Sequence, residues 1–158
     1  MNTGSITTRI FRFCNTLIGW IPGGLGHANV LASIVFAGMS GSAVADAAGL
    51  GTIEIKAMEE EGFDTDFSAA ITAASSTIGP IIPPSIPLIV FGVSAGGISI
   101  AKLLIGGVLP GLLVGICLSI MVYVFAVKRH YPCRKFPKGK ELWHDFKDAF
   151  FPLLTPII

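Results

Sequence analysis

Stretches without charged residues alternate with short polar segments along the 158-residue chain. One such stretch runs from Phe13 to Ala45, a second runs from Phe67 to Ala101, and a third covers residues 103–127. The third is a continuous apolar run that exceeds the ~20 residues needed to cross a bilayer as one helix. Glycine, serine and proline interrupt the other two. The pattern predicts an all-α integral membrane protein with a full transmembrane helix in residues 96–129.

Residues 1–22 are predicted to form an interfacial helix. A helix with one apolar stripe and polar residues elsewhere is suited to lie in the plane of the membrane surface. Pro22 and the glycines after it would end this helix. The apolar residues that recur at helical spacing are Ile6, Ile10, Cys14, Leu17 and Ile21. The polar residues that lie between them are Arg9, Arg12, Asn15 and Thr16.

Residues 23–62 allow two interpretations. In the first, residues 28–48 cross the membrane once, with Gly38 and Ser42 as a small-residue packing face. In the second, residues 25–39 enter the membrane, a turn reverses the chain, and residues 46–57 return to the starting side. Such a re-entrant helical hairpin is tolerated where protein or a water-filled cavity covers its backbone.

The distribution of basic residues favours the hairpin. Six of the eleven Lys and Arg residues lie between Lys128 and Lys140, so this segment is predicted to be cytoplasmic. Counting back across two spans places residues 54–66 on the cytoplasmic side as well. A hairpin leaves Arg9 and Arg12 on that same side, as the positive-inside bias prefers, whereas a single crossing places them outside.

Prolines interrupt the second charge-free run. Each proline removes a backbone donor and clashes with a preceding carbonyl, so a continuous helix cannot run through all of them. One proline would be a kink, but four predict an unwound segment inside a broken transmembrane helix over residues 63–95. Hydroxyl groups flank the break and can supply oxygens where carbonyls lose their helical partners. The residues concerned are Pro80, Pro83, Pro84 and Pro87, with Ser75, Ser76, Thr77 and Ser85.

Residues 130–158 are predicted to contain a cytoplasmic basic loop, a second interfacial helix and the start of a truncated span. The helix is indicated by an apolar stripe with charged residues opposite. The last eight residues are apolar but too short to span. The stripe consists of Leu142, Trp143, Phe146 and Phe150.

Composition narrows the class of protein. Hydrophobic residues make up 52% and charged residues 13% of the chain, which is typical of a membrane protein and not of a soluble domain. The basic cluster has no wider basic face and no aromatic platform, so nucleic-acid binding is not expected. The three cysteines form no CxxC pair, which argues against a disulfide framework or a metal knuckle. The N-terminal residues lack the pattern of a cleaved leader, so internal segments are expected to direct insertion.

The stretch GMSGSAVAD, residues 38–46, places two hydroxyls and a carboxylate inside apolar sequence. A charge at the bilayer centre costs about 2.5 to 3.5 kcal/mol on insertion scales, so Asp46 needs a partner, a hydration path or a function. At the start of a return arm it would accept backbone N–H bonds and complement the helix dipole. The alternatives are a direct role in binding a cation or proton, or a position near the interface.

The same stretch matches the G-x-S-G pattern of intramembrane serine proteases, with Ser40 as the nucleophile. A serine needs a base within hydrogen-bond reach. His27 lies 13 residues away, or ~20 Å along a helix, and His130 and His144 flank the cytoplasmic loop. The sequence therefore does not predict an enzyme.

A binding site fits these residues better. Gly41 allows a tight turn, and Ser40 and Ser42 offer hydroxyl oxygens. Half-helix N-termini offer N–H groups to an anion, and unwound carbonyls from Gly79 to Ser85 suit a hard cation such as sodium. A broken helix beside a re-entrant hairpin is typical of the midplane site of a secondary transporter.

Two long stretches resemble a known family. PGGLGHANVLASIVFAGMSGSAVADAAGLGTIEIKAMEEEGF, followed by FSAAITAASSTIGPIIPPSIPLIVFGVSAGGISIAKLLIGGVLPGLL, resembles the large membrane subunit, DctM-like, of tripartite ATP-independent periplasmic (TRAP) transporters. The resemblance implies the first repeat of an elevator-type ion-transporter fold, multi-pass in the bacterial inner membrane. It also implies import of organic acids, such as C4-dicarboxylates or sialic acids, with sodium as coupling ion. The expected partners are a small four-helix membrane subunit and a periplasmic solute-binding protein.

The resemblance also implies site residues. SGSAVAD matches the tip of the family's first hairpin, and STIGPIIPPS matches the unwound helix that faces this tip. The sodium candidates are Ser40, Ser42, Gly79 and Ser85. The full set of expected ion- and substrate-binding residues is Ser40, Gly41, Ser42, Asp46, Ser76, Thr77, Gly79, Pro83, Pro84 and Ser85.

The chain departs from the family in two respects. Family members are more than twice as long, so the resemblance implies that this chain holds one half of the transport site. Glu54 and Lys56 stand where an apolar residue and a proline are usual. A truncated membrane protein with only an assembly role is therefore an alternative to a transporting subunit.

Overall fold

The computed structural model describes residues 3–129 and residue 131, with side chains from residue 8 onward. Within this part of the chain it forms seven α-helices and no β-strand, which confirms the prediction of an all-α protein. The predicted basic loop, second interfacial helix and truncated span fall in residues 130–158 and lie outside the described residues, apart from Tyr131. The helices are α1 (Thr3–Ile18), α2 (Gly24–Ser40), α3 (Ala43–Gly49), α4 (Gly51–Glu60), α5 (Thr65–Ser76), α6 (Ile86–Ala95) and α7 (Ile100–Arg129).

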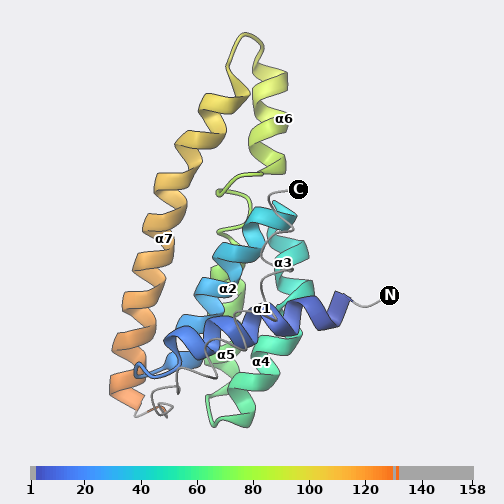
Figure 1. Cartoon of the computed structure of the whole chain (residues 1–158). Helices are drawn as coiled ribbons and strands as arrows, with labels where there is room; N and C mark the ends of the chain where they lie inside the picture. The colour runs from blue at the N-terminus through green and yellow to red at the C-terminus, as the bar shows by residue number, and fades with distance from the viewer. Residues whose placement is uncertain (1–2, 130, 132–158) are drawn as a thin grey trace.

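Helix α7 runs the whole length of the molecule (Figure 1). Its 30 residues correspond to about 45 Å of helix. Among the described helices it is the one long and apolar enough to cross a membrane, and only 17% of its most apolar window is buried inside the chain. The hairpin of α2, α3 and α4 lies together with α5 beside the lower half of α7. Helix α6 lies beside the upper half of α7.

Glycines let α7 pack closely against its neighbours. Gly107, Gly111 and Gly115 recur every fourth residue and so lie on one face of the helix. A Cβ atom at Gly107 would lie 2.3 Å from the Ile81 carbonyl oxygen, and one at Gly115 would lie 2.8 Å from the end of the Ile34 side chain. This small-residue face was not predicted from the sequence, although its spacing is typical of helix packing in membranes.

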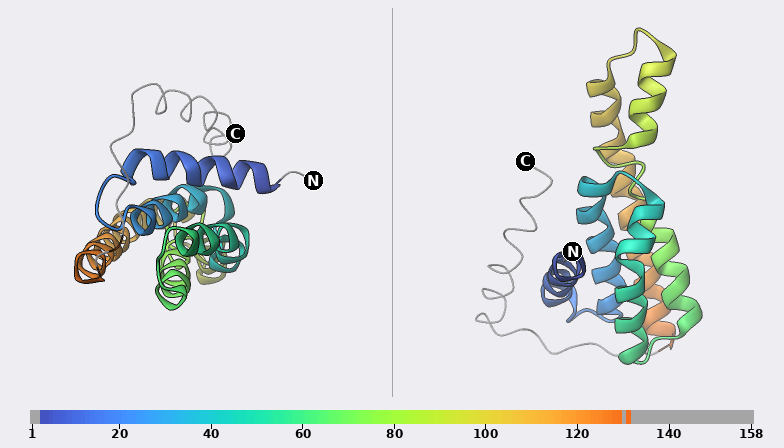
Figure 2. Two further views of the ribbon diagram at one scale, coloured as in Figure 1. Left: turned by 90° about the horizontal axis from the view of Figure 1, so that it is seen from below. Right: turned by 90° about the vertical axis from the view of Figure 1, so that its right-hand side faces the viewer.

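Helix α1 crosses the outer face of the hairpin at a steep angle to α2 (Figure 2). Its buried face contains Ile10, Phe11 and Cys14, whereas Arg9 is exposed. Leu17, predicted to lie on the apolar stripe, is 42% exposed. The helix is therefore amphipathic as predicted, but its packed face is rotated away from Leu17.

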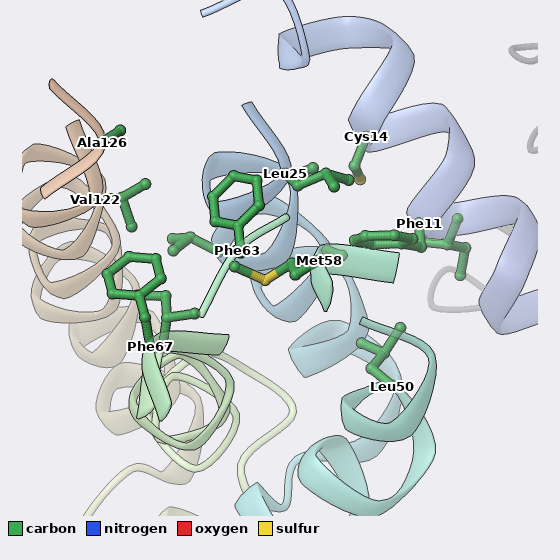
Figure 3. Packing of buried hydrophobic residues seen from close by; sticks show 14 of the residues in the cluster. Phe11, Cys14, Leu25, Leu50, Met58, Phe63, Phe67, Val122 and Ala126 are labelled. Carbon is green, nitrogen blue, oxygen red and sulfur yellow. The ribbon is translucent and has the colours of Figure 1, made fainter. Parts of the chain in front are cut away.

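The hydrophobic core lies where α1, the hairpin, α5 and α7 meet. Figure 3 shows Phe11 and Cys14 reaching from α1 toward Leu25 and Met58 of the hairpin. Phe63 and Phe67 lie on the side that faces α7, and Phe67 is in ring contact with Phe125 at 5.8 Å between centroids. This core occupies the lower half of the molecule and fixes the hairpin against α5.

The hairpin reverses direction at Gly41. Gly41 has φ 59°, a left-handed conformation that suits glycine, and its N–H donates to the Ala37 carbonyl at the end of α2. Ser42 is extended and caps α3 by accepting from the Ala45 N–H at 3.5 Å. The chain reversal predicted between residues 39 and 46 is therefore present, and α3 and α4 run back alongside α2.

The second charge-free run is interrupted as the prolines predicted. Helix α5 ends at Ser76 and α6 begins at Ile86, with irregular backbone between them. The Pro83–Pro84 peptide bond is cis. Ser85 caps α6, because its hydroxyl accepts from the Leu88 N–H at 3.2 Å.

Candidate functional site

The tip of the hairpin packs directly against the irregular segment between α5 and α6. A Cβ atom at Gly41 would lie 2.1 Å from the Pro84 carbonyl oxygen, so the two backbones are in contact there. A Cβ atom at Gly79 would lie 3.3 Å from the Ser42 carbonyl carbon. Two glycines thus allow the turn and the break to meet, and this meeting point is the candidate functional site.

Oxygen atoms gather at this meeting point. The Ser40 hydroxyl makes only long contacts with the backbone of Ser42, at 3.4 and 3.5 Å. The Ser85 hydroxyl is buried and donates to the Pro80 carbonyl, so it closes the break internally. The carbonyls of Gly79 and Pro84 receive no hydrogen bond from the described residues. The site therefore offers backbone and hydroxyl oxygens, which are hard ligands.

The remaining site residues predicted on the break lie on different sides of it. The Ser76 hydroxyl donates to the Ala73 carbonyl at 2.8 Å, and the Thr77 hydroxyl donates to the Ala74 carbonyl at 2.7 Å. Both hydroxyls therefore bind within their own helix. Ser76 is buried, Thr77 is exposed and Pro83 is half-buried. The structure thus brings Gly41, Ser42, Gly79 and Pro84 together, but it does not bring Thr77 to the same point.

Asp46 lies in the first turn of α3, as expected for an acidic residue that complements the helix dipole. The predicted capping bonds are absent, because Ser42 caps the helix. Asp46 is 1% exposed, and neither carboxylate oxygen has a hydrogen-bond partner among the described residues. This corrects the expectation that Asp46 accepts backbone N–H bonds. Its carboxylate lies inside the hairpin instead.

Glu54 is a second buried carboxyl group, and its burial was not predicted from the sequence. It is 0% exposed and also lacks a hydrogen-bond partner within the described part of the chain. Asp46, Leu50, Glu54 and Met58 follow one another at intervals of four and are all at most 1% exposed. This stripe faces the inside of the hairpin, and its spacing was the signal in the sequence that could have identified Glu54.

A buried hydrogen-bond network joins the hairpin to α5. Asn29 donates to the Thr72 hydroxyl at 2.7 Å, and the Ser75 hydroxyl donates to the Asn29 side-chain oxygen at 2.7 Å. Ser33 donates to the Ser75 hydroxyl at 3.1 Å. These polar residues were not singled out as a group, because their partners are more than 40 residues apart in the sequence.

The arrangement does not suit nucleophilic catalysis by Ser40. His27 lies in the first turn of α2 and Ser40 is the last residue of the same helix. Their separation of 13 positions corresponds to ~20 Å along a helix. The contacts of the Ser40 hydroxyl are with Ser42 and not with a base.

Two surface grooves lie away from the tip. One, of about 960 Å³, runs between α5 and α7, and its lining includes Asp64, Phe67 and Arg129. The other, of about 460 Å³, lies between α2 and α7, where His27 and Tyr123 contribute to its walls. Neither groove includes the contact between Gly41 and Pro84, so the candidate site is defined by backbone contact and not by a cavity.

A polar cluster joins the start of α5 to the end of α7. The Tyr131 hydroxyl donates to an Asp64 carboxylate oxygen at 2.6 Å, and Arg129 forms an ion pair with the same oxygen. The hydrogen bond from Tyr131, followed by that from Arg129, lowers the pKa of Asp64 from its ordinary value. Burial, followed by the hydrogen bond to Asp64, raises the pKa of Tyr131.

Together, the long apolar helix, the short hairpin and the interrupted helix define a helical membrane protein. The DctM component of the tripartite ATP-independent periplasmic transporter is the family whose sequence profile matches, over residues 1–158. The chain belongs to this family and corresponds to part of its large permease, as the resemblance implied.

Curated relatives agree with this assignment. The chain is 51% identical over its whole length to the sialic acid TRAP transporter permease protein SiaT of Haemophilus influenzae, of which it covers 26%. It is 48% identical to the sialic acid TRAP transporter large permease protein SiaM of Vibrio cholerae, of which it covers 37%. The C4-dicarboxylate TRAP transporter large permease protein DctM of Vibrio cholerae is 37% identical, with 35% of that protein covered. These relatives are membrane permeases and not enzymes, and the chain spans well under half of their length.

Proposed function

We propose that this chain supplies the first hairpin and the broken helix of a TRAP-type secondary transporter in the bacterial inner membrane. The observation that carries the proposal is the contact between Gly41 at the hairpin tip and the Pro84 carbonyl at the break. A short hairpin that meets an unwound helix is the arrangement in which transporters of this kind bind substrate and coupling ion.

The hairpin dimensions support a re-entrant position in a multi-pass protein. Helix α2 has 17 residues, or about 25 Å, which is less than the ~30 Å hydrocarbon core. Figure 1 shows the tip near the middle of α7, which is long enough to span. If α7 crosses the bilayer, the tip lies near the midplane, as an elevator-type transporter requires for its site.

The proposed ion is sodium, bound as coupling ion at the tip. The Ser40 hydroxyl makes only long contacts, the Ser42 hydroxyl accepts from the Ala45 N–H at 3.5 Å, and the Gly79 and Pro84 carbonyls accept no hydrogen bond from the described residues. The Ser85 hydroxyl binds the Pro80 carbonyl within the break, whereas the Ser76 and Thr77 hydroxyls bind within their own helix. Carbonyl and hydroxyl oxygens without thiolate or imidazole suit a hard cation.

The proposed cargo is an organic acid of the sialic-acid class. Support comes from the relatives named for sialic acid, which are 51% and 48% identical, against 37% for the relative named for C4-dicarboxylates. An anionic substrate is suited to the N-terminal end of α6, which begins at the break and has no acidic residue in its first turn. A C4-dicarboxylate is the second candidate substrate.

The proposed partners follow from the family. A small membrane subunit would accompany the permease, and a periplasmic solute-binding protein would deliver the acid. The bilayer would cover the exposed apolar surface of α6 and α7, where Val93, Ile105 and Leu109 are 67 to 76% exposed.

Uptake into proteoliposomes tests the proposal in a complete permease that contains this chain. Ser40→Ala, Ser42→Ala and Asp46→Asn should each lower sodium-dependent uptake of sialic acid by about tenfold or more, because a lost ligand worth 1.4 kcal/mol is a tenfold effect. Thr52→Ala is the matched control, since Thr52 is exposed on α4, away from the tip. Wild-type uptake in all three variants would refute the site.

Two other outcomes identify the alternatives. If no reconstitution transports but the chain copurifies with partner subunits, it has only an assembly role. If a fluorophosphonate probe labels Ser40, the protein is an intramembrane hydrolase.

A further inference from the structure

The groove of about 960 Å³ between α5 and α7 is bounded by two helices that run in opposite directions. Asp64, directly before α5, forms an ion pair with Arg129, the last residue of α7. Beyond the other end of α5, Ile78 lies beside the middle of α7, where a Cβ atom at Gly115 would be 3.9 Å from the end of its side chain. The start of α5 and the end of α7 therefore lie together at one end of the groove.

The charged side chains of the groove all lie at this end, and the lining further along it is apolar. The charged residues are Asp64, Asp66 and Arg129. Eight residues further into the groove, or about 12 Å of helix, α5 contributes Ala74 and α7 contributes Met121. The groove thus has the polarity of a lipid molecule, with one charged end and a long apolar part.

The length of α7 places this polarity correctly for a bilayer. Its 30 residues, about 45 Å, match the 40–45 Å of a bilayer with its headgroup regions. With α7 across the membrane, Arg129 lies at the level of the headgroups, and Met121 lies among the acyl chains. Lys128 and Arg129 in the last turn are typical of this interface. This step requires α7 to cross the bilayer, but it does not require transport.

The charges at the polar end select the headgroup. Asp64 is paired with Arg129 and accepts from the Tyr131 hydroxyl at 2.6 Å. Asp66 is exposed and forms no ion pair within the described residues. The printed bonds of Arg129 use only its Nη1, so the N–H groups of Nε and Nη2 remain for a phosphate. The polar end therefore offers donors to a phosphate and a carboxylate to an ammonium group.

Other occupants suit this end less well. A closely packed protein helix would remove Asp66 from water without a partner for its charge, which is strongly unfavourable. An anionic headgroup without an ammonium group would bring a second negative charge beside Asp66. A quaternary ammonium group has the matching charge but no N–H to donate.

We propose that the groove between α5 and α7 binds one phospholipid with a primary-ammonium headgroup. The ammonium group binds Asp66, the phosphate binds Arg129, and one acyl chain lies along Ala70, Ala74 and Met121. Burial of the acyl chain supplies affinity for any phospholipid, and the two charged contacts supply the choice of headgroup. The site is separate from the hairpin tip and goes beyond the proposed function.

Photocrosslinking in a complete permease that contains this chain tests the proposal. The permease is placed in nanodiscs with equal amounts of dioleoyl phosphatidylethanolamine, phosphatidylcholine and phosphatidylglycerol, which differ only in the headgroup. The photoreactive residue benzoylphenylalanine replaces either Met121, which lines the groove, or Val124, which is 56% exposed on α7 and does not line it. After irradiation, mass spectrometry identifies the lipid or the protein segment that is joined to each position.

At the position of Met121, adducts with phosphatidylethanolamine should exceed those with phosphatidylcholine by about two- to fivefold, the range of one exposed ion pair. At the position of Val124, adducts should follow the composition of the bilayer. Asp66→Asn should remove the preference at the first position. Glu59→Gln, exposed on α4 and outside the groove, should leave the preference unchanged.

The same lipid ratios at both positions would overturn the proposal, because the groove would then hold bulk lipid. A crosslink from the position of Met121 to a protein segment would overturn it as well, and so would a preference that persists in folded Asp66→Asn. The ratios without Asp66→Asn decide the proposal if that variant does not fold. Because no uptake is measured, failure here is separate from failure of the proposed function.

Discussion

Gly41→Ala is expected to separate the hairpin tip from the break. Gly41 has φ 59°, and an added Cβ would lie 2.1 Å from the Pro84 carbonyl oxygen. The left-handed conformation costs a non-glycine residue about 1–2 kcal/mol. The clash is with backbone, which cannot rotate away as a side chain can, and overpacking adds about 1–3 kcal/mol. The variant should therefore lose about 2–5 kcal/mol of unfolding free energy.

Gly62→Ala provides the matched control. Gly62 has φ 89°, also positive, but an added Cβ meets nothing within 4 Å. It should show the conformational cost alone, about 1–2 kcal/mol. The difference between the two variants isolates the contact of the tip with the break.

The assay is titration of each variant with SDS in mixed micelles, followed by far-UV circular dichroism. Comparison of the two transition midpoints and slopes gives the difference in unfolding free energy. Equal losses in both variants would refute the reasoning, because the clash at Pro84 would then contribute nothing. A larger loss in Gly62→Ala would refute it equally.

Three further predictions concern the support of the site. Gly107→Ala should destabilise the chain by about 1–3 kcal/mol, because the added Cβ would lie 2.3 Å from a backbone oxygen. Gly106→Ala is the control and should not destabilise the chain, because its added Cβ meets nothing within 4 Å. Thermal unfolding of the two variants tests this difference. Asn29→Ala should cost about 1–3 kcal/mol, because the buried Thr72 hydroxyl loses its donor, whereas Ser75 keeps its bond to the Thr72 carbonyl; SDS titration measures the loss. Hydrogen bonds from Tyr131 and Arg129 lower the pKa of Asp64. The ionised Asp64 therefore stabilises the fold at every pH above its ordinary pKa of 3.8, and this stabilisation is lost as the pH falls through the lowered pKa. Asp64→Asn should remove that acid-side dependence of the midpoint, and an unchanged acid dependence would contradict the bond from Tyr131.

The break in the second charge-free run could be predicted because its cause is local. Pro80, Pro83 and Pro84 remove donors wherever they stand in a helix, and no distant contact can restore them. The structure interrupts the helix between Ser76 and Ile86. The reversal at Gly41 was predictable for the same kind of reason, since glycine and serine support a turn and a cap.

The buried polar groups of the hairpin could not be predicted in the same way. Glu54 stands in a charged segment, so its local sequence does not predict burial, but tertiary packing of the hairpin and α5 leaves it 0% exposed. Asn29 bonds to Thr72, 43 residues away, and nothing in local sequence specifies that partner. Spacing at intervals of four, from Asp46 to Met58, was the available signal.

The tip and its support form one mechanical unit. Gly41 and Gly79 hold the turn against the break at one end, and the bonds between Asn29, Thr72 and Ser75 hold α2 to α5 at the other. Parting the hairpin from α5 would leave buried polar groups unpaired, at about 1–3 kcal/mol each. In the transporter proposed above, movements that open or close the site should therefore occur around this unit and not within it. The oxygens offered at the tip are largely backbone oxygens, so the identity of the substrate is expected to depend on side chains that face this unit from other parts of a complete permease.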